Sequence, residues 1–98
     1  MTMLGMAKKA GALLVGQKAC EEAIVSGKAK LILLAKDAGR STRRNFLHLS
    51  KKHEVELFEI ADKQALGKPI GFQKAAVIAV TDFNWTKTLK ESLNLGGE

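Results

Sequence analysis

The chain has 98 residues, enough for one domain with a modest hydrophobic core. Apolar residues make up 46% and charged residues 27%, which is typical of a soluble globular protein and argues against intrinsic disorder. No run approaches the roughly 18–20 apolar residues of a membrane span, and Lys8 and Lys9 come too early for a secretory leader. A single cysteine, Cys20, excludes a disulfide framework, so we expect a reducing, cytoplasmic setting.

Positive charge is concentrated in the first half of the chain. There are 16 basic and 10 acidic residues, a formal net charge of +6. Residues 1–53 hold eleven of the basic residues and only three acids, whereas residues 54–98 hold five basic residues and seven acids. This asymmetry predicts a polyanionic partner.

Helical and strand-like segments alternate along the sequence. In chain order, the patterns predict a helix over 2–10, a strand over 13–15, a helix over 16–26, a strand over 31–35, a helix from Ser41 or Thr42 to about His53, a strand over 55–60, a short helix over 62–67, a strand over 75–81 and a helix from Asn84 onward. The run 31–35 is wholly apolar, as in a strand covered on both faces. The alternation predicts a three-layer α/β/α sandwich with a small four-stranded sheet.

Capping and core residues follow from the same patterns. We expect Ser41 or Thr42, then Asp62, then Asn84 to cap the helices that they begin. The predicted inward-facing residues are Leu4 and Ala7 in the first helix, Ala19, Cys20, Ala23 and Ile24 in the second, Phe46, Leu47 and Leu49 in the third, and Trp85, Leu89 and Leu93 in the last.

No constellation of residues supports catalysis or a metal site. The run 11–18 begins like a nucleotide phosphate loop, but its lysine comes one residue late and Ala19 replaces the hydroxyl that would bind magnesium. His48 and His53 are five positions apart, which is poor spacing for a shared metal on a helix. Cys20 lies on an apolar stripe, where a buried, inert thiol is expected. We therefore expect no metal, no cofactor and no small-molecule substrate, and we predict that the protein is not an enzyme.

Arginines gather where the third predicted helix begins. Arg43 and Arg44 lie in its opening turn, and Arg40 comes just before it. Basic residues at a helix N-terminus are unfavourable by a few tenths of a kcal/mol each. An external anion, such as a phosphate that fits the planar guanidinium, would compensate them. A solvated helix end without a partner is the alternative.

Two further stretches have a composition suited to nucleic acid. Gly16 precedes a helix, where it leaves the first backbone N–H groups open to phosphate or base acceptors, or serves only the geometry of the turn. The stretch 66–74 has two glycines, a proline and two lysines, together with Ile70 and Phe72. These two apolar side chains either pack against an unstacked base or fold back onto the core.

Several stretches in their order resemble the kink-turn RNA-binding ribosomal protein superfamily, which includes the L-seven-Ae, L-thirty-e and Gadd-forty-five proteins, and within it the small bacterial members. The stretches are Leu4–Gly11, Gly16, Ala23-Ile24, Gly27, Ala29–Ala38, Leu66–Lys68, Gly71 and Ala79–Asp82. The resemblance covers about residues 3–83.

This resemblance implies an α/β/α sandwich with a four-stranded mixed sheet, and one RNA-binding domain over residues 1–98. In family members that bind kink-turns, the first turn of the second helix reads tandem G·A pairs, and a loop before the last strand covers a flipped-out base. Carried over to this sequence, the implied RNA-binding residues are Gly16, Gln17, Lys18, Ala19 and Glu22 on the helix, Lys36 after the central strand, and Ile70, Phe72, Gln73 and Lys74 in the loop. Arg40, Arg43 and Arg44 lie outside that surface, where they are expected to add phosphate contacts.

The expected partner is structured RNA, either ribosomal RNA or another kink-turn RNA, with association with the ribosome and none with membranes. A rival hypothesis is a protein-interaction module on the same fold. It is favoured by Lys18-Ala19, which stand where archaeal-type kink-turn binders have Asn-Glu.

Overall fold

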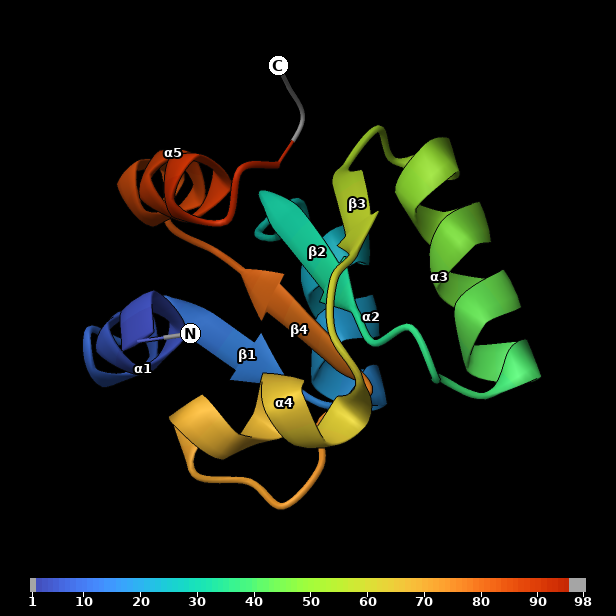
Figure 1. Cartoon of the computed structure of the whole chain (residues 1–98). Coiled ribbons are helices and arrows are strands. Elements are labelled where there is room, and N and C mark those ends of the chain that lie inside the picture. The colour runs from blue at the N-terminus through green and yellow to red at the C-terminus, as the bar shows by residue number, and fades with distance from the viewer. Residues whose placement is uncertain (1, 96–98) are drawn as a thin grey trace.

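The computed structural model describes residues 2–95, in which helices and strands alternate as the sequence predicts (Figure 1). The elements in chain order are α1 (Thr2–Lys9), β1 (Leu13–Val15), α2 (Gln17–Val25), β2 (Leu31–Leu34), α3 (Arg40–Lys52), β3 (Glu56–Glu59), α4 (Lys63–Gly67), the 3-10 helix η1 (Lys68–Ile70), β4 (Val77–Val80) and α5 (Phe83–Ser92). The 3-10 helix η1 is the one element among them that the sequence patterns did not predict.

The four strands form one mixed sheet with the order β1-β4-β2-β3. Strand β4 is antiparallel to both of its neighbours, and β2 is parallel to β3. In this register Val15 lies opposite Ile78, and Leu34 lies opposite Val77. The end of β1, the end of β2 and the beginning of β4 therefore lie at the same edge of the sheet.

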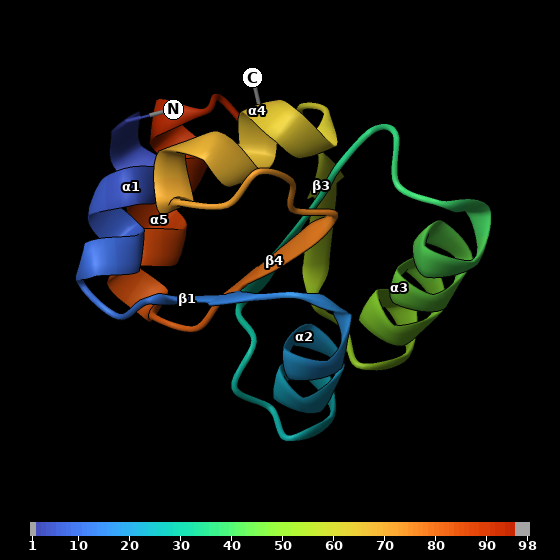
Figure 2. The ribbon, with the colours of Figure 1, turned by 90° about the horizontal axis from the view of Figure 1, so that it is seen from below.

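Helices cover both faces of the sheet (Figure 2). Helices α1, α4 and α5 lie on one side, and α2 and α3 lie side by side on the other. The predicted three-layer α/β/α sandwich with a four-stranded mixed sheet is confirmed.

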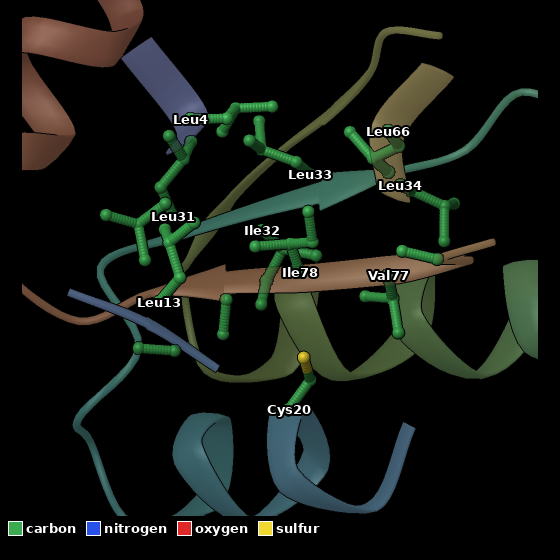
Figure 3. Close-up of a cluster of buried hydrophobic side chains, with 14 of the residues drawn as sticks. Leu4, Leu13, Cys20, Leu31, Ile32, Leu33, Leu34, Leu66, Val77 and Ile78 are labelled. Atoms are coloured by element: carbon green, nitrogen blue, oxygen red, sulfur yellow. The ribbon is translucent and has the colours of Figure 1, made fainter. Parts of the chain in front are cut away.

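The core lies on both sides of the two central strands. All residues of β2 and β4 are fully buried, as expected for apolar strands between two helical layers. In Figure 3, Leu4 and Leu66 approach the sheet from one side and Cys20 approaches it from the other. Burial of these side chains supplies most of the favourable free energy of folding.

The beginning of α3 differs from its prediction. The helix begins at Arg40 with Gly39 at the N-cap position, and no side chain caps it. Ser41 and Thr42 therefore lie inside the first turn, and neither is the cap. The three arginines consequently fall within the helix, at its first, fourth and fifth positions.

Of the caps predicted for the last two α-helices, one is confirmed and the other is wrong. The carboxylate of Asp62 accepts a hydrogen bond from the Ala65 N–H at 2.8 Å, so the predicted cap of α4 is confirmed. Helix α5 begins earlier than predicted, because Asp82 accepts a hydrogen bond from the Trp85 N–H at 2.9 Å. The prediction that Asn84 is this cap is wrong, since Asn84 lies within the first turn.

One predicted core residue is exposed. Phe46 is fully buried and Leu49 is partly buried, but 45% of Leu47 is exposed. Successive residues on a helix are rotated by about 100°, so the residue directly after Phe46 points away from the sheet. The other predicted core residues are buried or partly buried, with Ala19, Trp85 and Leu93 in the second group.

Candidate nucleic-acid interface

Three segments that are distant in sequence meet at the edge of the sheet where β4 begins. The Gly16 N–H donates to the Val77 carbonyl at 3.2 Å, and the Ala35 N–H donates to the Ala76 carbonyl at 2.8 Å. The beginning of α2, the residues after β2 and the loop before β4 are therefore side by side. The residues implied by the family resemblance belong to these three segments.

The first turn of α2 presents backbone donors to solvent. The first hydrogen bond of the helix runs from the Cys20 N–H to the Gly16 carbonyl, at 3.0 Å. The N–H groups of Gln17, Lys18 and Ala19 thus have no acceptor within the helix. Gly16 has φ of 103° and ψ of 158°, a region that is nearly restricted to glycine, and a Cβ there would meet nothing within 4 Å. Glycine is therefore needed for its backbone conformation, which also leaves this helix end open.

The side chains around this turn are mixed in character. Gln17, Lys18 and Glu22 are exposed, and Ala19 is partly buried. Glu21 lies on the side toward α3, where it accepts a hydrogen bond from the Asn45 side chain. The first two turns of α2 therefore offer amide and ammonium donors to a ligand, together with one exposed carboxylate.

The loop before β4 is held in place by a close approach of backbone. A Cβ on Gly67 would lie 2.9–3.0 Å from backbone atoms of Phe72, Lys74 and Ala75, so only glycine lets the loop fold so tightly onto α4. The Phe72 N–H donates to the Gly67 carbonyl at 3.0 Å, and the Ala75 N–H donates to the Lys63 carbonyl at 3.0 Å. The loop is thus fixed at both ends.

This fixed loop divides its apolar side chains between core and solvent. Ile70 is buried, with 7% exposure, and it belongs to the core. Phe72 is 43% exposed, and Gln73 and Lys74 are exposed beside it. Of the two alternatives for this pair, Ile70 therefore folds back onto the core, and the ring of Phe72 is accessible. A solvent-open groove of about 590 Å³ runs along the loop and is lined by Gln64, Lys68, Gly71, Phe72, Gln73 and Lys74.

Lys36 is exposed at the same edge, directly after β2. Its N–H donates to the Ala61 carbonyl at 2.7 Å, and its carbonyl accepts from the Arg43 guanidinium at 2.5 Å. Arg43 also forms an ion pair with Glu59 at the end of β3. Arg43 therefore has internal partners and differs from Arg40 and Arg44, which are exposed and have no ion pair with any described residue.

Most acids at this edge are engaged within the protein. Asp37 accepts a hydrogen bond from the Lys63 N–H at 2.8 Å, and Asp62 caps α4. Glu59 is paired with Arg43, and Glu21 is bonded to Asn45. Glu22 is the exposed acid of α2 that has no such partner among the described residues. Only the contact of Glu59 with Arg43 pairs opposite charges, because the donors to Asp37, Asp62 and Glu21 are neutral N–H groups.

The remaining side chains that could bind a metal or act as a nucleophile are dispersed or buried. Within residues 2–95, no three His, Cys, Asp or Glu side chains come together as a metal site. Burial raises the pKa of the Cys20 thiol to about 12, so the thiol is protonated and unreactive at neutral pH. No helix in the described part of the chain has both the length and the apolar character needed to cross a bilayer.

Sequence patterns missed the residues that hold the site together. Gly67 was identified as a helix end, whereas its close approach to residues 72–75 depends on the tertiary fold. The contact between Arg43 and Glu59 depends on the parallel pairing of β2 with β3, which places the end of β3 beside Lys36. A strand that ends in an acid, next to a helix that begins with arginines, is the signal that points to such a pair.

Comparisons with known proteins agree on one family. Residues 1–90 match the model of the ribosomal protein L7Ae/L30e/S12e/Gadd45 family. The "RNA-binding protein YlxQ" of Enterococcus faecium is 30% identical over 91 residues, which cover 93% of this chain and 87% of that protein. The protein of the same name from Bacillus subtilis (strain 168) is 29% identical over 87 residues, covering 89% of this chain and 87% of that protein.

Two solved structures share the fold. A Bacillus halodurans protein of unknown function superposes with a TM-score of 0.89 at 28% identity, covering 95% of this chain and 94% of that chain. The Giardia lamblia 15.5 kD RNA binding protein superposes with a TM-score of 0.80 at 17% identity, covering 95% of this chain and 82% of that chain.

Proposed function

This chain belongs to the ribosomal protein L7Ae/L30e/S12e/Gadd45 family, and we propose that it binds kinked, structured RNA at the edge of the sheet where α2 begins, without catalysing a reaction. The observation that carries the proposal is the convergence of open N–H groups, exposed lysines and one accessible aromatic ring at this edge. Relatives named as RNA-binding proteins over most of this chain support it.

Each segment has a role in the proposed complex. The N–H groups and side chains of Gln17 and Lys18 meet base edges and phosphate oxygens at the positive end of α2. The ring of Phe72 stacks on an unpaired base, a contact worth about 1–3 kcal/mol. Lys36 and Lys74 contact the phosphate backbone. Ile70 acts from the core, where it holds the loop that presents Phe72.

Binding is proposed to select the bent form of the RNA. A kink brings two negatively charged backbones close together, which is costly without compensating charge. The loop is fixed by Gly67 and the helix start by Gly16, so the surface is formed before RNA arrives. A surface that fits only the bent form shifts the RNA population toward it.

A fluorescence titration of a kink-turn duplex against a straight duplex, over a range of salt concentrations, tests this proposal. We expect tighter binding to the kinked RNA and a steep loss of affinity with salt. The Lys18→Glu, Lys74→Glu double variant is expected to lose RNA binding at about physiological salt. A matched control is the Lys8→Glu, Lys87→Glu variant, which makes the same charge change on α1 and α5, and it should bind much more tightly than the first variant. Equal affinity of the native protein for both RNAs contradicts kink recognition.

A protein-interaction module on the same fold is the second candidate. The exposed carboxylate of Glu22 favours it, because an acid in this position repels phosphate. Pull-down from a nuclease-treated lysate separates the candidates: specific partners retained after RNA removal support the module, and their loss supports RNA binding.

The proposal extends to the setting of the protein. We propose a cytoplasmic protein that associates with ribosomal RNA, in keeping with its single buried cysteine and its excess of basic residues. Co-sedimentation with ribosomal particles at low salt, and release at high salt, is the expected result. Absence from every ribosomal fraction would contradict association with the ribosome.

A further inference from the structure

The solvent side of α3 is positively charged and holds no acid. Of its thirteen residues five are arginine or lysine, and none is aspartate or glutamate. The buried side is formed by Thr42, Phe46 and Ser50. At about 100° per residue, Arg40, Arg44, Lys51 and Lys52 fall within about 60° of the opposite side. We call Arg40, Arg44 and Lys51 the α3 stripe.

The cations of the α3 stripe have no internal counter-charge. All three are exposed, and none has an ion pair with a described residue. Arg43, one residue before Arg44, is turned toward the sheet and is neutralised by Glu59. The helix thus contains one paired arginine beside four cations without an ion pair to a described residue, namely the stripe and Lys52. Two of the four lie near its N-terminus, where positive charge is unfavourable. An anion from outside the molecule would relieve this cost.

The spacing of the α3 stripe indicates the kind of anion. Arg40 and Lys51 are eleven residues apart, about 16 Å along the axis. The gaps within the stripe are about 6 Å from Arg40 to Arg44 and about 10 Å from Arg44 to Lys51. Cations spread over this length can face several phosphates of one strand and exceed the size of a single small anion. The guanidinium fork is suited to phosphate oxygens. Leu47 is the exposed apolar residue of α3 beside the stripe, and one leucine is too little for the apolar centre of a protein interface.

The helix that carries the α3 stripe is joined to the elements of the proposed RNA interface. Arg43 binds the Lys36 carbonyl, and Asn45 binds Glu21, so α3 is joined both to the edge of the sheet and to α2. Figure 2 shows α3 alongside α2 on one side of the sheet. An RNA that is bent over the beginning of α2 can therefore continue along α3.

We propose that the α3 stripe is a second binding surface, which holds the phosphate backbone of a duplex stem that flanks the kink. This inference rests on the proposed function for the identity of the partner. The contacts are electrostatic and independent of sequence, so the stripe increases affinity for long stems without distinguishing among them.

Fluorescence anisotropy with RNAs of different stem length tests the second surface. The stripe variant is Arg40→Gln, Arg44→Gln, Lys51→Gln, and the matched control is Lys8→Gln, Lys9→Gln, Lys87→Gln, which removes the same charge from α1 and α5. Both are titrated with a kink-turn RNA that has two long stems and with versions in which each stem is shortened in turn. Thermal melting checks that both variants remain folded, as expected for exposed positions.

The expected result depends on stem length. The stripe variant should lose roughly tenfold or more in affinity for the long-stem RNA, and its salt slope should fall by about 2–3. For one of the shortened RNAs the loss should be less than about twofold, because the phosphates that face α3 are absent. The control variant should lose much less on the long-stem RNA.

Three outcomes overturn the second surface. The first is no loss of affinity in the stripe variant, and the second is an equal loss of affinity for all three RNAs. The third is that polyglutamate competes for binding as strongly as duplex RNA of equal charge, which would indicate an acidic protein as partner. The proposed function is tested separately by the preference of the native protein for kinked over straight RNA. If that preference is missing, loss of straight-duplex binding in the stripe variant still supports the second surface. If the native protein binds no RNA, both proposals fail.

Discussion

Helices α2 and α3 lie side by side on one face of the sheet, yet they differ in what they present to solvent. Helix α2 presents its beginning, with free N–H groups at Gln17 and Lys18 and a carboxylate at Glu22. Helix α3 presents its flank, a row of cations without an acid. The first arrangement selects a ligand by its shape, and the second attracts a ligand by its charge. One small domain thus offers both geometric selection and general attraction for a polyanion.

The largest loss of stability is expected when the packing of α3 against the sheet is removed. Phe46 is the fully buried aromatic residue of α3, so Phe46→Ala should lower the free energy of unfolding by about 3–5 kcal/mol. Urea denaturation measures this loss. The neighbouring Leu47→Ala change is a matched control, because Leu47 is 45% exposed and should cost well under 1 kcal/mol. Similar losses in the two variants would contradict the orientation of α3.

A change at the beginning of α2 alone should separate the binding of kinked RNA from the binding of straight duplex. Gly16 has φ of 103°, so Gly16→Ala should strain the backbone by about 1–3 kcal/mol and displace the first turn. We expect a lower melting temperature and weaker binding to kinked RNA, while straight-duplex binding through α3 is retained. Gly39→Ala is the control, since Gly39 precedes α3 with an ordinary φ of −59° and should lose less than about 1 kcal/mol. If Gly16→Ala lost affinity for kinked and straight RNA equally, the beginning of α2 and the α3 stripe would act as a single binding surface.

The prediction with no expected effect at neutral pH concerns Cys20, on the inner side of α2. Burial raises the pKa of Cys20 from 9.0 to about 12, so the folded state holds this proton more tightly than the unfolded state. The stability that depends on this proton is fully present below pH 9 and is lost as pH rises toward 12. Urea denaturation should show a progressive decline in the free energy of unfolding as pH rises above 9. In Cys20→Ala this part of the decline should be missing. Identical pH profiles of stability for the native protein and Cys20→Ala would contradict the assignment of the decline to the Cys20 thiol.

Residues that are ordered by local chemistry were predictable from the sequence. The apolar runs of β2 and β4 indicate central strands, because only strands between two layers can bury every side chain. Asp62 was predictable as a cap because its carboxylate bonds a residue three positions ahead. The prediction of Asn84 as a cap failed because Asp82, two residues earlier, is an equally good capping residue and accepts the hydrogen bond from the Trp85 N–H.

Residues that are ordered by long-range contacts were not predictable. Helical periodicity places Arg43 nearer the buried side than Arg44, but only the fold brings Glu59 beside Arg43 and leaves Arg44 in solvent. Ile70 and Phe72 are two positions apart in a loop, and the fold buries one and exposes the other. The implied site residues remain predictions, although the structure brings together the three segments that carry them.

The position of β4 has a consequence for the order in which the molecule can be built during translation. This strand is the last of the four to be synthesised, and it lies between β1 and β2, which do not pair with each other. A nascent chain that has not yet emerged as far as Val80 has nothing to bridge those two strands. Helix α2 can form early, but the N–H of Gly16, the residue before it, donates to the Val77 carbonyl of β4. The earliest-made half of the molecule, which carries most of the positive charge, therefore stays without its final shape until nearly the whole chain is available.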